Sequence, residues 1–138
     1  MNKPSNVVLL IDDEPKIRRF LRAGFELQGY SVLEAENAAD GLKVATFSAP
    51  DLVILDLGLP GGSGFIVLER LKANTTLACI PVIILTADES PESEFKGLEA
   101  GAAAFLHKPV QEVALIAAVE CAVGDGAECP ITDAELQR

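Results

Sequence analysis

Short runs of consecutive apolar residues recur at regular intervals along the chain. Three of them, at residues 7–11, 52–55 and 82–85, contain only Val, Leu and Ile. Runs without polar alternation are typical of parallel strands that are buried on both faces of a sheet. Weaker strand candidates at 31–35 and 102–106 follow from their positions in the same rhythm. The pattern therefore predicts five strands.

Helical patterns separate these strands. Between Pro15 and Gly29, apolar residues recur at helical spacing, with proline near the first turn and glycine as a stop signal. Further helices are expected at residues 38–47, 64–73, 91–100 and about 110–123. A strand followed by a helix, repeated five times, folds through right-handed crossovers into one doubly wound parallel sheet. We therefore expect a single α/β domain of the (βα)5 type.

The end of the chain does not continue this rhythm. Residues 124–138 contain a Gly-Asp-Gly sequence and a Cys-Pro pair before a polar end. We expect one domain at residues 1–123, followed by a C-terminal tail or the stub of a linker at 124–138. The sequence does not distinguish the tail from the linker.

Composition narrows the class of protein. The chain has 138 residues, of which 49% are hydrophobic, and this is enough apolar material for one compact core. The net charge of −10 argues against direct nucleic-acid binding by this chain, because binding to phosphate backbones needs clustered Lys and Arg. No apolar run approaches the roughly 18 residues of a membrane span, so no membrane association is expected. The three cysteines match no metal-ligand spacing, which favours a reducing, cytoplasmic location.

Polar residues follow four of the expected strands. Asp12 and Asp13 end the first strand, Asp56 the third, Thr86 the fourth and Lys108 the fifth. In open α/β sheets, ligands bind outside the carboxyl ends of the strands, so these side chains are expected to converge at one edge. We therefore treat them as one candidate site.

Each residue also has an ordinary structural explanation. Asp13 could cap the first helix, Thr86 could belong to a turn, and Lys108 could be a solvated strand end. Asp56 is harder to explain in this way, because it directly follows four apolar residues, where an unpaired carboxylate is unfavourable. The ordinary explanations must also hold at four strand ends at once, which favours the functional interpretation.

The residue types indicate phosphoryl chemistry. Crowded carboxylates repel one another unless a cation neutralises them, and a few carboxylates with several waters suit Mg²⁺, which typically joins a phosphate to its site. An Asp can act as a nucleophile and form an aspartyl phosphate. Lys108 would balance phosphoryl charge, and Thr86 would donate a hydrogen bond to a phosphoryl oxygen. The inferred reaction is Mg²⁺-assisted transfer of a phosphoryl group onto Asp56.

In order and spacing, these residues resemble those of response-regulator receiver domains of two-component signal transduction, in the CheY-like superfamily. The resemblance covers residues 6–123. Its motifs are Asp12-Asp13, the Leu-Asp-Leu-Gly-Leu-Pro sequence around Asp56 with Gly64 following, Thr86-Ala87 and Lys108-Pro109. The resemblance implies a flavodoxin-like sheet of five parallel strands in the order 2-1-3-4-5.

The resemblance also implies a mechanism. Asp56 is the implied phosphoacceptor, which receives its phosphoryl group from a histidine kinase or a histidine phosphotransfer protein. The implied Mg²⁺ ligands are Asp12 or Asp13, Asp56 and the carbonyl group of Gly58. Asp13 is the expected direct ligand, and Asp12 is expected to act through water. Such a protein catalyses only its own phosphorylation and dephosphorylation, so it is a signalling switch rather than an enzyme with a separate substrate.

The switch is implied to involve Thr86 and Phe105. In the family, the hydroxyl group moves to the phosphoryl group while the aromatic ring turns inward. These movements change the face formed by the fourth helix, the fifth strand and the fifth helix, which controls a partner or an output domain in a phosphorelay. The family often has tyrosine at the position of Phe105, so this ring lacks a hydroxyl group. The resemblance also implies a cis peptide bond before Pro109.

The sequence also bears on contacts with partners. The motif at Asp56 and the basic first helix resemble those of receivers from winged-helix transcription factors, which dimerise through charged residues. Here the matching positions are Ala103, Ala104 and Ala118, so that salt-bridged dimer is not expected. The last helix is apolar around most of its circumference at 113–119. It is either an Ala-rich helix with ordinary packing or a docking face for a partner or a homodimer.

Three rival classes fit less well. A phosphatase of the haloacid dehalogenase type needs a second acid where this chain has Gly58. A flavodoxin-like FMN protein needs a loop rich in Ser, Thr and Gly after the first strand, where Asp12 and Asp13 would repel phosphate. A degenerate receiver would lack one of the five site residues, and all five are present. The sequence therefore favours a phosphoacceptor receiver domain.

Overall fold

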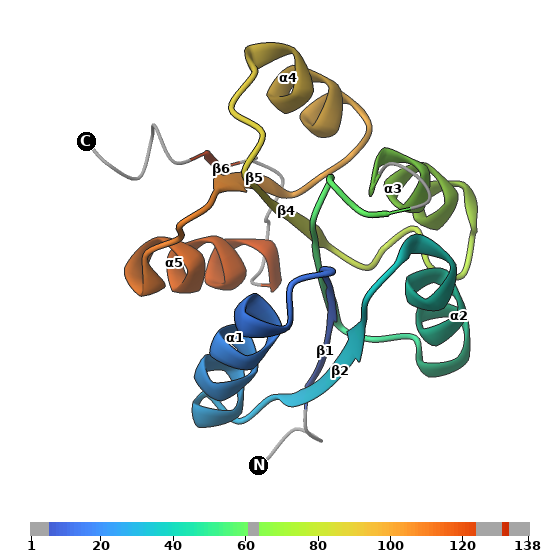
Figure 1. The fold of residues 1–138 in the computed structure, drawn as a ribbon. Coiled ribbons are helices and arrows are strands. Elements are labelled where there is room, and N and C mark those ends of the chain that lie inside the picture. The colour runs from blue at the N-terminus through green and yellow to red at the C-terminus, as the bar shows by residue number, and fades with distance from the viewer. Residues whose placement is uncertain (1–5, 61–63, 124–130, 133–138) are drawn as a thin grey trace.

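The computed structural model describes residues 6–60, 64–123 and 131–132. These residues form a parallel sheet flanked by helices (Figure 1). The strands are β1 (Val7–Ile11), β2 (Ser31–Ala35), β3 (Leu52–Leu55), β4 (Val82–Thr86), β5 (Ala104–His107) and β6 (Ile131–Thr132). The helices are α1 (Pro15–Leu27), α2 (Ala38–Ser48), α3 (Gly64–Ala73), α4 (Pro91–Glu99) and α5 (Glu112–Val123).

The strand order is β2-β1-β3-β4-β5-β6, and every neighbouring pair is parallel. The first five strands confirm the predicted order 2-1-3-4-5. The central strands are buried on both faces, as their uninterrupted apolar sequences predict, and β3 and β4 are buried at every position.

A sixth strand of two residues extends the predicted five-stranded sheet at its β5 edge. Ile131 and Thr132 lie in the segment 124–138, which was expected to be a tail or linker stub, and they pair with Ala104 and Phe105 of β5. Two residues carry no detectable periodicity, so this pairing could not be read from the hydrophobic pattern. The rest of that segment lies outside the described residues.

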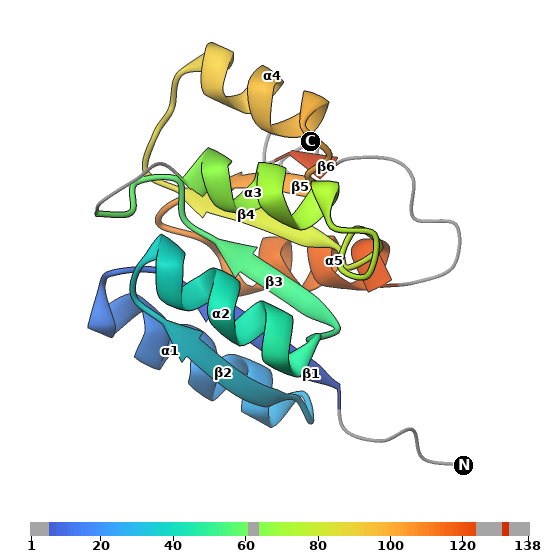
Figure 2. The ribbon, with the colours of Figure 1, turned by 90° about the vertical axis from the view of Figure 1, so that its right-hand side faces the viewer.

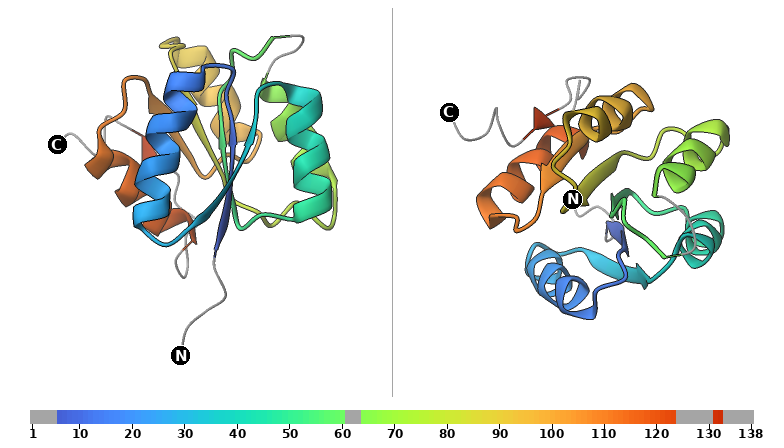
Figure 3. Two further views of the ribbon diagram at one scale, coloured as in Figure 1. Left: turned by 60° about the horizontal axis from the view of Figure 1, so that its bottom comes forward. Right: turned by 45° about the horizontal axis from the view of Figure 1, so that its top comes forward.

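Helices cover both faces of the sheet (Figure 3). On one face, α1 and α5 contribute Leu21, Phe25 and Leu115 to a core cluster with the strands. On the other face, α2 and α3 contribute Ala45 and Leu68 to a second cluster, and α4 lies at its β5 end. This two-faced burial is the arrangement that repeated strand–helix units require.

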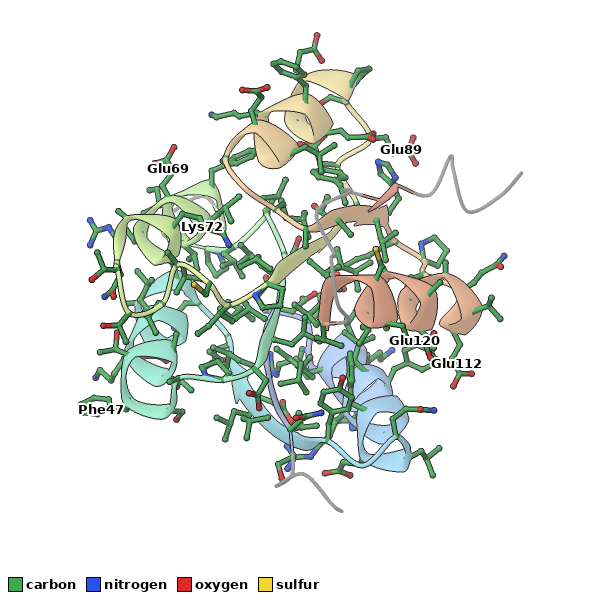
Figure 4. The ribbon with its side chains drawn as sticks, turned by 180° about the vertical axis from the view of Figure 1, so that it is seen from behind. Phe47, Glu69, Lys72, Glu89, Glu112 and Glu120 are labelled. Atoms are coloured by element: carbon green, nitrogen blue, oxygen red, sulfur yellow. The ribbon has the colours of Figure 1, made fainter. Side chains whose placement is uncertain are left out.

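Local signals set several helix ends. Pro15 occupies the first turn of α1, and Gly29 follows this helix with a φ of 93°, a conformation that glycine adopts without strain. Asn37 caps α2 by accepting a hydrogen bond from the N–H of Asp40 at 2.8 Å. At the end of α3, the Lys72 ammonium donates to the carbonyl of Ala78 at 3.0 Å, and Figure 4 shows it directed inward.

The described helices include none that is both long and apolar enough to cross a bilayer.

Candidate functional site

The predicted site residues converge at the carboxyl ends of the central strands. The loops after β1, β3 and β4 lie on the same side of the sheet (Figure 2). A cleft of about 400 Å³ opens there, and its lining includes Asp13, Asp56, Thr86 and Lys108. Asp12 lies directly beside this cleft, within the same acidic group. The structure therefore brings together all the residues that the sequence analysis placed at this edge.

Three carboxylates form the acidic part of the site. Oxygen atoms of Asp12, Asp13 and Asp56 all lie within 4.8 Å of one another. Asp12 and Asp56 are buried, with 4% and 6% of their surface exposed, whereas Asp13 is exposed. Burial is the main reason that the pKa of Asp12 is raised, and hydrogen bonds from Lys108 and the Glu14 N–H offset it only in part. This group of carboxylates therefore needs a balancing positive charge.

Lys108 supplies one positive charge. Its Nζ lies 2.8 Å from Asp12 Oδ2 and 3.3 Å from Asp56 Oδ2, and its side chain is 12% exposed. Burial by itself lowers the pKa of Lys108, but the hydrogen bonds and charges of the two carboxylates outweigh burial, and the net shift is upward. The Lys108–Pro109 peptide bond is cis, as the resemblance implied. Lys108 is therefore charged and held between the two buried acids.

The backbone holds Asp56 in the lining of the cleft. Its N–H donates to the carbonyl of Ile11 at 2.9 Å, which fixes the end of β3 beside the end of β1. One carboxylate oxygen, Oδ1, accepts from the N–H of Gly58 at 3.1 Å. Gly64 then brings the start of α3 close, because a Cβ at this position would lie 2.4 Å from the Asp56 carbonyl oxygen. Only glycine permits this approach.

The predicted switch residues occupy different environments. Thr86 is 2% exposed and lines the cleft, where its Oγ1 accepts from the N–H of Asp88 at 3.3 Å. Phe105 is fully buried beneath α4 and outside the cleft lining, and its ring stacks edge-on with His107 at 5.4 Å. The ring is therefore already turned inward in this structure, while the Thr86 hydroxyl is bonded within its own loop.

Sequence reasoning missed two residues of the cleft. Glu14 and Phe65 both line it, and Glu14 Oε1 lies 3.5 Å from Lys108 Nζ. Glu14 directly follows the Asp-Asp pair, which was a usable signal. Phe65 carried no such signal, because an aromatic residue at a helix start usually belongs to the core. Its ring lies 4.5 Å below the ammonium of Lys96.

The donor set suits a hard divalent cation. Carboxylate oxygens from two strand ends face one another, one of the acids is solvent-exposed, and the cleft leaves room for water. Mg²⁺ prefers this combination of few protein oxygens and several waters. Gly58 also lines the cleft, as its predicted role requires. The residues present therefore fit the ion that the sequence indicated.

Comparison with known proteins agrees with this geometry. The family model described as "Response regulator receiver domain" matches residues 8–120. The chain is 38% identical over 128 residues to the phosphate regulon transcriptional regulatory protein PhoB of Pseudomonas aeruginosa, covering 90% of this chain and 56% of that protein. It is 43% identical over 102 residues to the KDP operon transcriptional regulatory protein KdpE of Escherichia coli, covering 74% and 44%. The chain thus spans about half the length of these transcriptional regulators.

A shorter relative and a solved structure match over most of their own length. Protein PilH of Pseudomonas aeruginosa is 37% identical over 109 residues, covering 79% of this chain and 90% of PilH. Chemotaxis response regulator CheY4 of Vibrio cholerae superposes with a TM-score of 0.80 at 26% identity, covering 86% of this chain and 99% of CheY4. The family model, the relatives and the fold agree, and this chain belongs to the response regulator receiver domains of two-component systems.

Proposed function

We propose that this chain accepts a phosphoryl group on Asp56 from a histidine kinase or a histidine phosphotransfer protein, in a Mg²⁺-dependent reaction within a phosphorelay. One observation carries the proposal: Asp56 is the only one of the three clustered carboxylates that is both buried and part of the cleft lining. Burial shields most of the Asp56 side chain from water, while the cleft gives a phosphodonor access to its carboxylate.

Lys108 and Thr86 are proposed to position the phosphoryl group during its transfer to Asp56. An Asp56 oxygen attacks phosphorus, the bond to the donor's nitrogen breaks, and the donor histidine recovers a neutral ring by taking up a proton. Lys108 already contacts Asp56 Oδ2 at 3.3 Å, so its ammonium is placed to pair with a phosphoryl oxygen on that atom. Thr86, in the same cleft, is proposed to donate a hydrogen bond from its hydroxyl group to another phosphoryl oxygen.

Asp12, Asp13, Asp56 and the Gly58 carbonyl are the proposed ligands for Mg²⁺. When bound, the ion would neutralise charge on the carboxylates and on the transferred phosphoryl group. The exposed position of Asp13 supports direct ligation. Asp12 is drawn toward Lys108 by a 2.8 Å ion pair, which supports the proposed role through water.

Phosphorylation is proposed to act outward through the face formed by α4, β5 and α5. Thr86 and Phe105 are the proposed switch pair, and Phe105 lies in β5 directly beneath α4. A covalent phosphoryl group would bias an equilibrium between two arrangements of this face. That face would then control a partner or an output domain.

The apolar last helix is a second proposed contact surface, for a partner or a second copy of the chain. α5 buries Leu115 and Val119 in the core but leaves Val113 79% exposed. Figure 4 shows Glu112 and Glu120 on the same helix, and both line an apolar groove of about 460 Å³ between α1 and α5. We place this signalling role in the cytoplasm, without direct nucleic-acid or membrane binding by this chain.

Intact mass spectrometry after incubation with acetyl phosphate tests the chemistry. We expect one phosphoryl adduct on the wild type in the presence of Mg²⁺, and none after chelation or in Asp56→Asn. Asp40→Asn is a matched control, because Asp40 is exposed on α2 and should keep the adduct. A wild type that gains no adduct and also fails to bind beryllofluoride would instead be a docking module without phosphorylation.

A further inference from the structure

Helix α4 is attached to the sheet through very little buried side chain. Among its residues only Gly97 is buried, whereas Phe95 is 68% exposed. The approach at Gly97 is close, because a Cβ there would lie 2.8 Å from the end of Ile84 and 3.1 Å from the Phe105 ring.

Near the last turn, Leu98 also packs against the core cluster, and the Lys96 ammonium lies 4.5 Å from the centre of the Phe65 ring. The first turn has no buried residue, so its position depends on other contacts.

Those contacts come from three residues of the loop and first turn of α4. Asp88 Oδ1 accepts from the N–H of Ser90 at 2.9 Å, and Asp88 Oδ2 accepts from the hydroxyl of Ser93 at 2.6 Å. Ser90 in turn caps the helix by accepting from the N–H of Ser93 at 3.2 Å. We call these three hydrogen bonds the Asp88 clamp. They use both oxygens of one carboxylate to tie the loop to the helix.

The clamp is joined directly to the cleft. The N–H of Asp88 donates to Thr86 Oγ1 at 3.3 Å, and both residues line the cleft. Hydrogen bonds from Ser93 and Ser90 lower the pKa of Asp88, because they favour its charged form. The negatively charged carboxylate of Asp88 therefore lies in the cleft lining, two residues after Thr86, which is proposed to bind the phosphoryl group.

We propose that Asp88 is a positioning residue for the switch: its clamp holds α4 and the Thr86 hydroxyl in the arrangement described here, in which Thr86 Oγ1 accepts from the Asp88 N–H although the Phe105 ring is already inward. This inference rests on the proposed function. The bond from the Asp88 N–H to Thr86 is already long at 3.3 Å, so movement of Oγ1 toward Asp56 breaks it. A phosphoryl group in the cleft also repels the clamped carboxylate. Phosphorylation and the clamp therefore oppose each other.

Linkage makes this opposition measurable. If the clamp stabilises the arrangement in which Thr86 Oγ1 accepts from the Asp88 N–H, its removal must strengthen binding of any ligand that draws Thr86 away from it. Beryllofluoride with Mg²⁺ is the probe, because it mimics a phosphoryl group on an Asp carboxylate. Ser93→Ala is the informative variant, since it removes one hydrogen bond from the clamp without changing any charge in the cleft.

The experiment is a beryllofluoride titration of the full chain followed by fluorine and amide NMR. We expect Ser93→Ala to bind about threefold to tenfold more tightly than the wild type, for the loss of one partly exposed hydrogen bond. Ser93→Thr keeps the hydroxyl and should restore wild-type affinity. Ser48→Ala, at the exposed end of α2, is the matched control and should have no effect.

A purely structural role for the clamp gives a different result. Ser93→Ala would then speed amide exchange in the first turn of α4 but leave beryllofluoride affinity unchanged or weaker. This outcome overturns the inference. Affinity that rises equally in Ser48→Ala also overturns it. A wild type that does not bind beryllofluoride overturns the proposed function itself and the inference with it, so the two failures are distinguishable.

Discussion

The helices that follow β3 and β4 both begin just beyond a site residue, yet they are held in different ways. α3 buries Gly64, Val67, Leu68 and Leu71 against the sheet. α4 fully buries only Gly97, packs the half-buried Leu98 against the core, and has hydrogen bonds at its first turn. The end of α3 is also secured, because the Lys72 ammonium donates to the carbonyls of the following loop.

This difference separates a scaffold from a responsive element. Under the proposed function, Asp56 must keep its position while its charge changes, and the packed α3 beside it supplies that rigidity. Thr86, as the proposed switch residue, must respond to the phosphoryl group, and a helix with little buried area can follow it at small energetic cost. We call the side of the cleft with Asp56 and α3 the scaffold half, and the side with Thr86 and α4 the responsive half. The scaffold half needs a rigid helix and the responsive half needs a movable one, and the packing of α3 and α4 agrees with this.

The largest expected difference between the two helices is in the free energy of unfolding after truncation of one apolar side chain in each. Leu68→Ala removes a fully buried side chain and should lower the free energy of unfolding by about 3 kcal/mol. Phe95→Ala removes an exposed ring and should change it by less than about 0.5 kcal/mol. Urea denaturation followed by far-UV circular dichroism measures both. Similar losses in the two variants would show that α4 is packed as firmly as α3.

The two close-approach glycines sharpen the comparison. Gly64→Ala places a Cβ 2.4 Å from the backbone oxygen of Asp56, which cannot yield, so we expect a loss of about 2 kcal/mol. Gly97→Ala meets the ends of the Ile84 and Phe105 side chains, which can shift, so we expect about 1 kcal/mol or less. The same denaturation assay applies. A larger loss at Gly97 than at Gly64 would reverse the assignment of scaffold and responsive element.

Mg²⁺ binding should stabilise the scaffold half of the cleft without changing amide exchange in the responsive half. At ten times its dissociation constant the ion should stabilise the wild type by about 1.4 kcal/mol, and Asp13→Asn should lose most of this gain. Asp40→Asn is the control that should keep it. Amide exchange in α4 should not change with Mg²⁺ alone, but should change once beryllofluoride is added. A response of α4 to the ion by itself would mean that the two halves are not separate.

The sequence predicted the scaffold better than the responsive half. Continuous apolar runs define the central strands, and polar residues at their ends located the cleft, because parallel topology forces the strand ends together. The clamp was not predicted, since Asp88, Ser90 and Ser93 individually look like ordinary turn and capping residues. Which oxygen of Asp88 meets which donor depends on backbone angles that no spacing rule gives.

Long-range pairing also limited the prediction. The sequence placed Asp12 and Lys108 at one sheet edge, but their 2.8 Å ion pair joins residues 96 positions apart and depends on side-chain burial. The pairing of β6 with β5 was missed because two residues carry no period. Both failures concern contacts that are set by tertiary packing rather than by local pattern.

The smallest expected effect, a pH dependence, tests the electrostatics of the two halves. Burial raises the pKa of Asp12, so the folded protein holds this proton more tightly than the unfolded chain does. Stability contributed by the protonated form is therefore lost as pH rises from the ordinary value of 3.8 through the higher folded value. Asp12→Asn lacks this loss. With a chelator present, the stability of Asp12→Asn relative to the wild type should rise as the pH increases above the ordinary value of 3.8 and level off above the higher folded pKa of Asp12.

Asp88→Asn provides the contrast from the α4 half. Hydrogen bonds from Ser93 and Ser90 lower the pKa of Asp88, so its charged form stabilises the folded protein above 3.8 and this gain is lost only at lower pH. The stability difference between Asp88→Asn and the wild type should therefore be constant over the range in which the Asp12→Asn difference grows. Urea denaturation at several pH values measures both slopes. Parallel slopes would mean that one environment governs both carboxylates, and the division of the cleft into two halves would then fail.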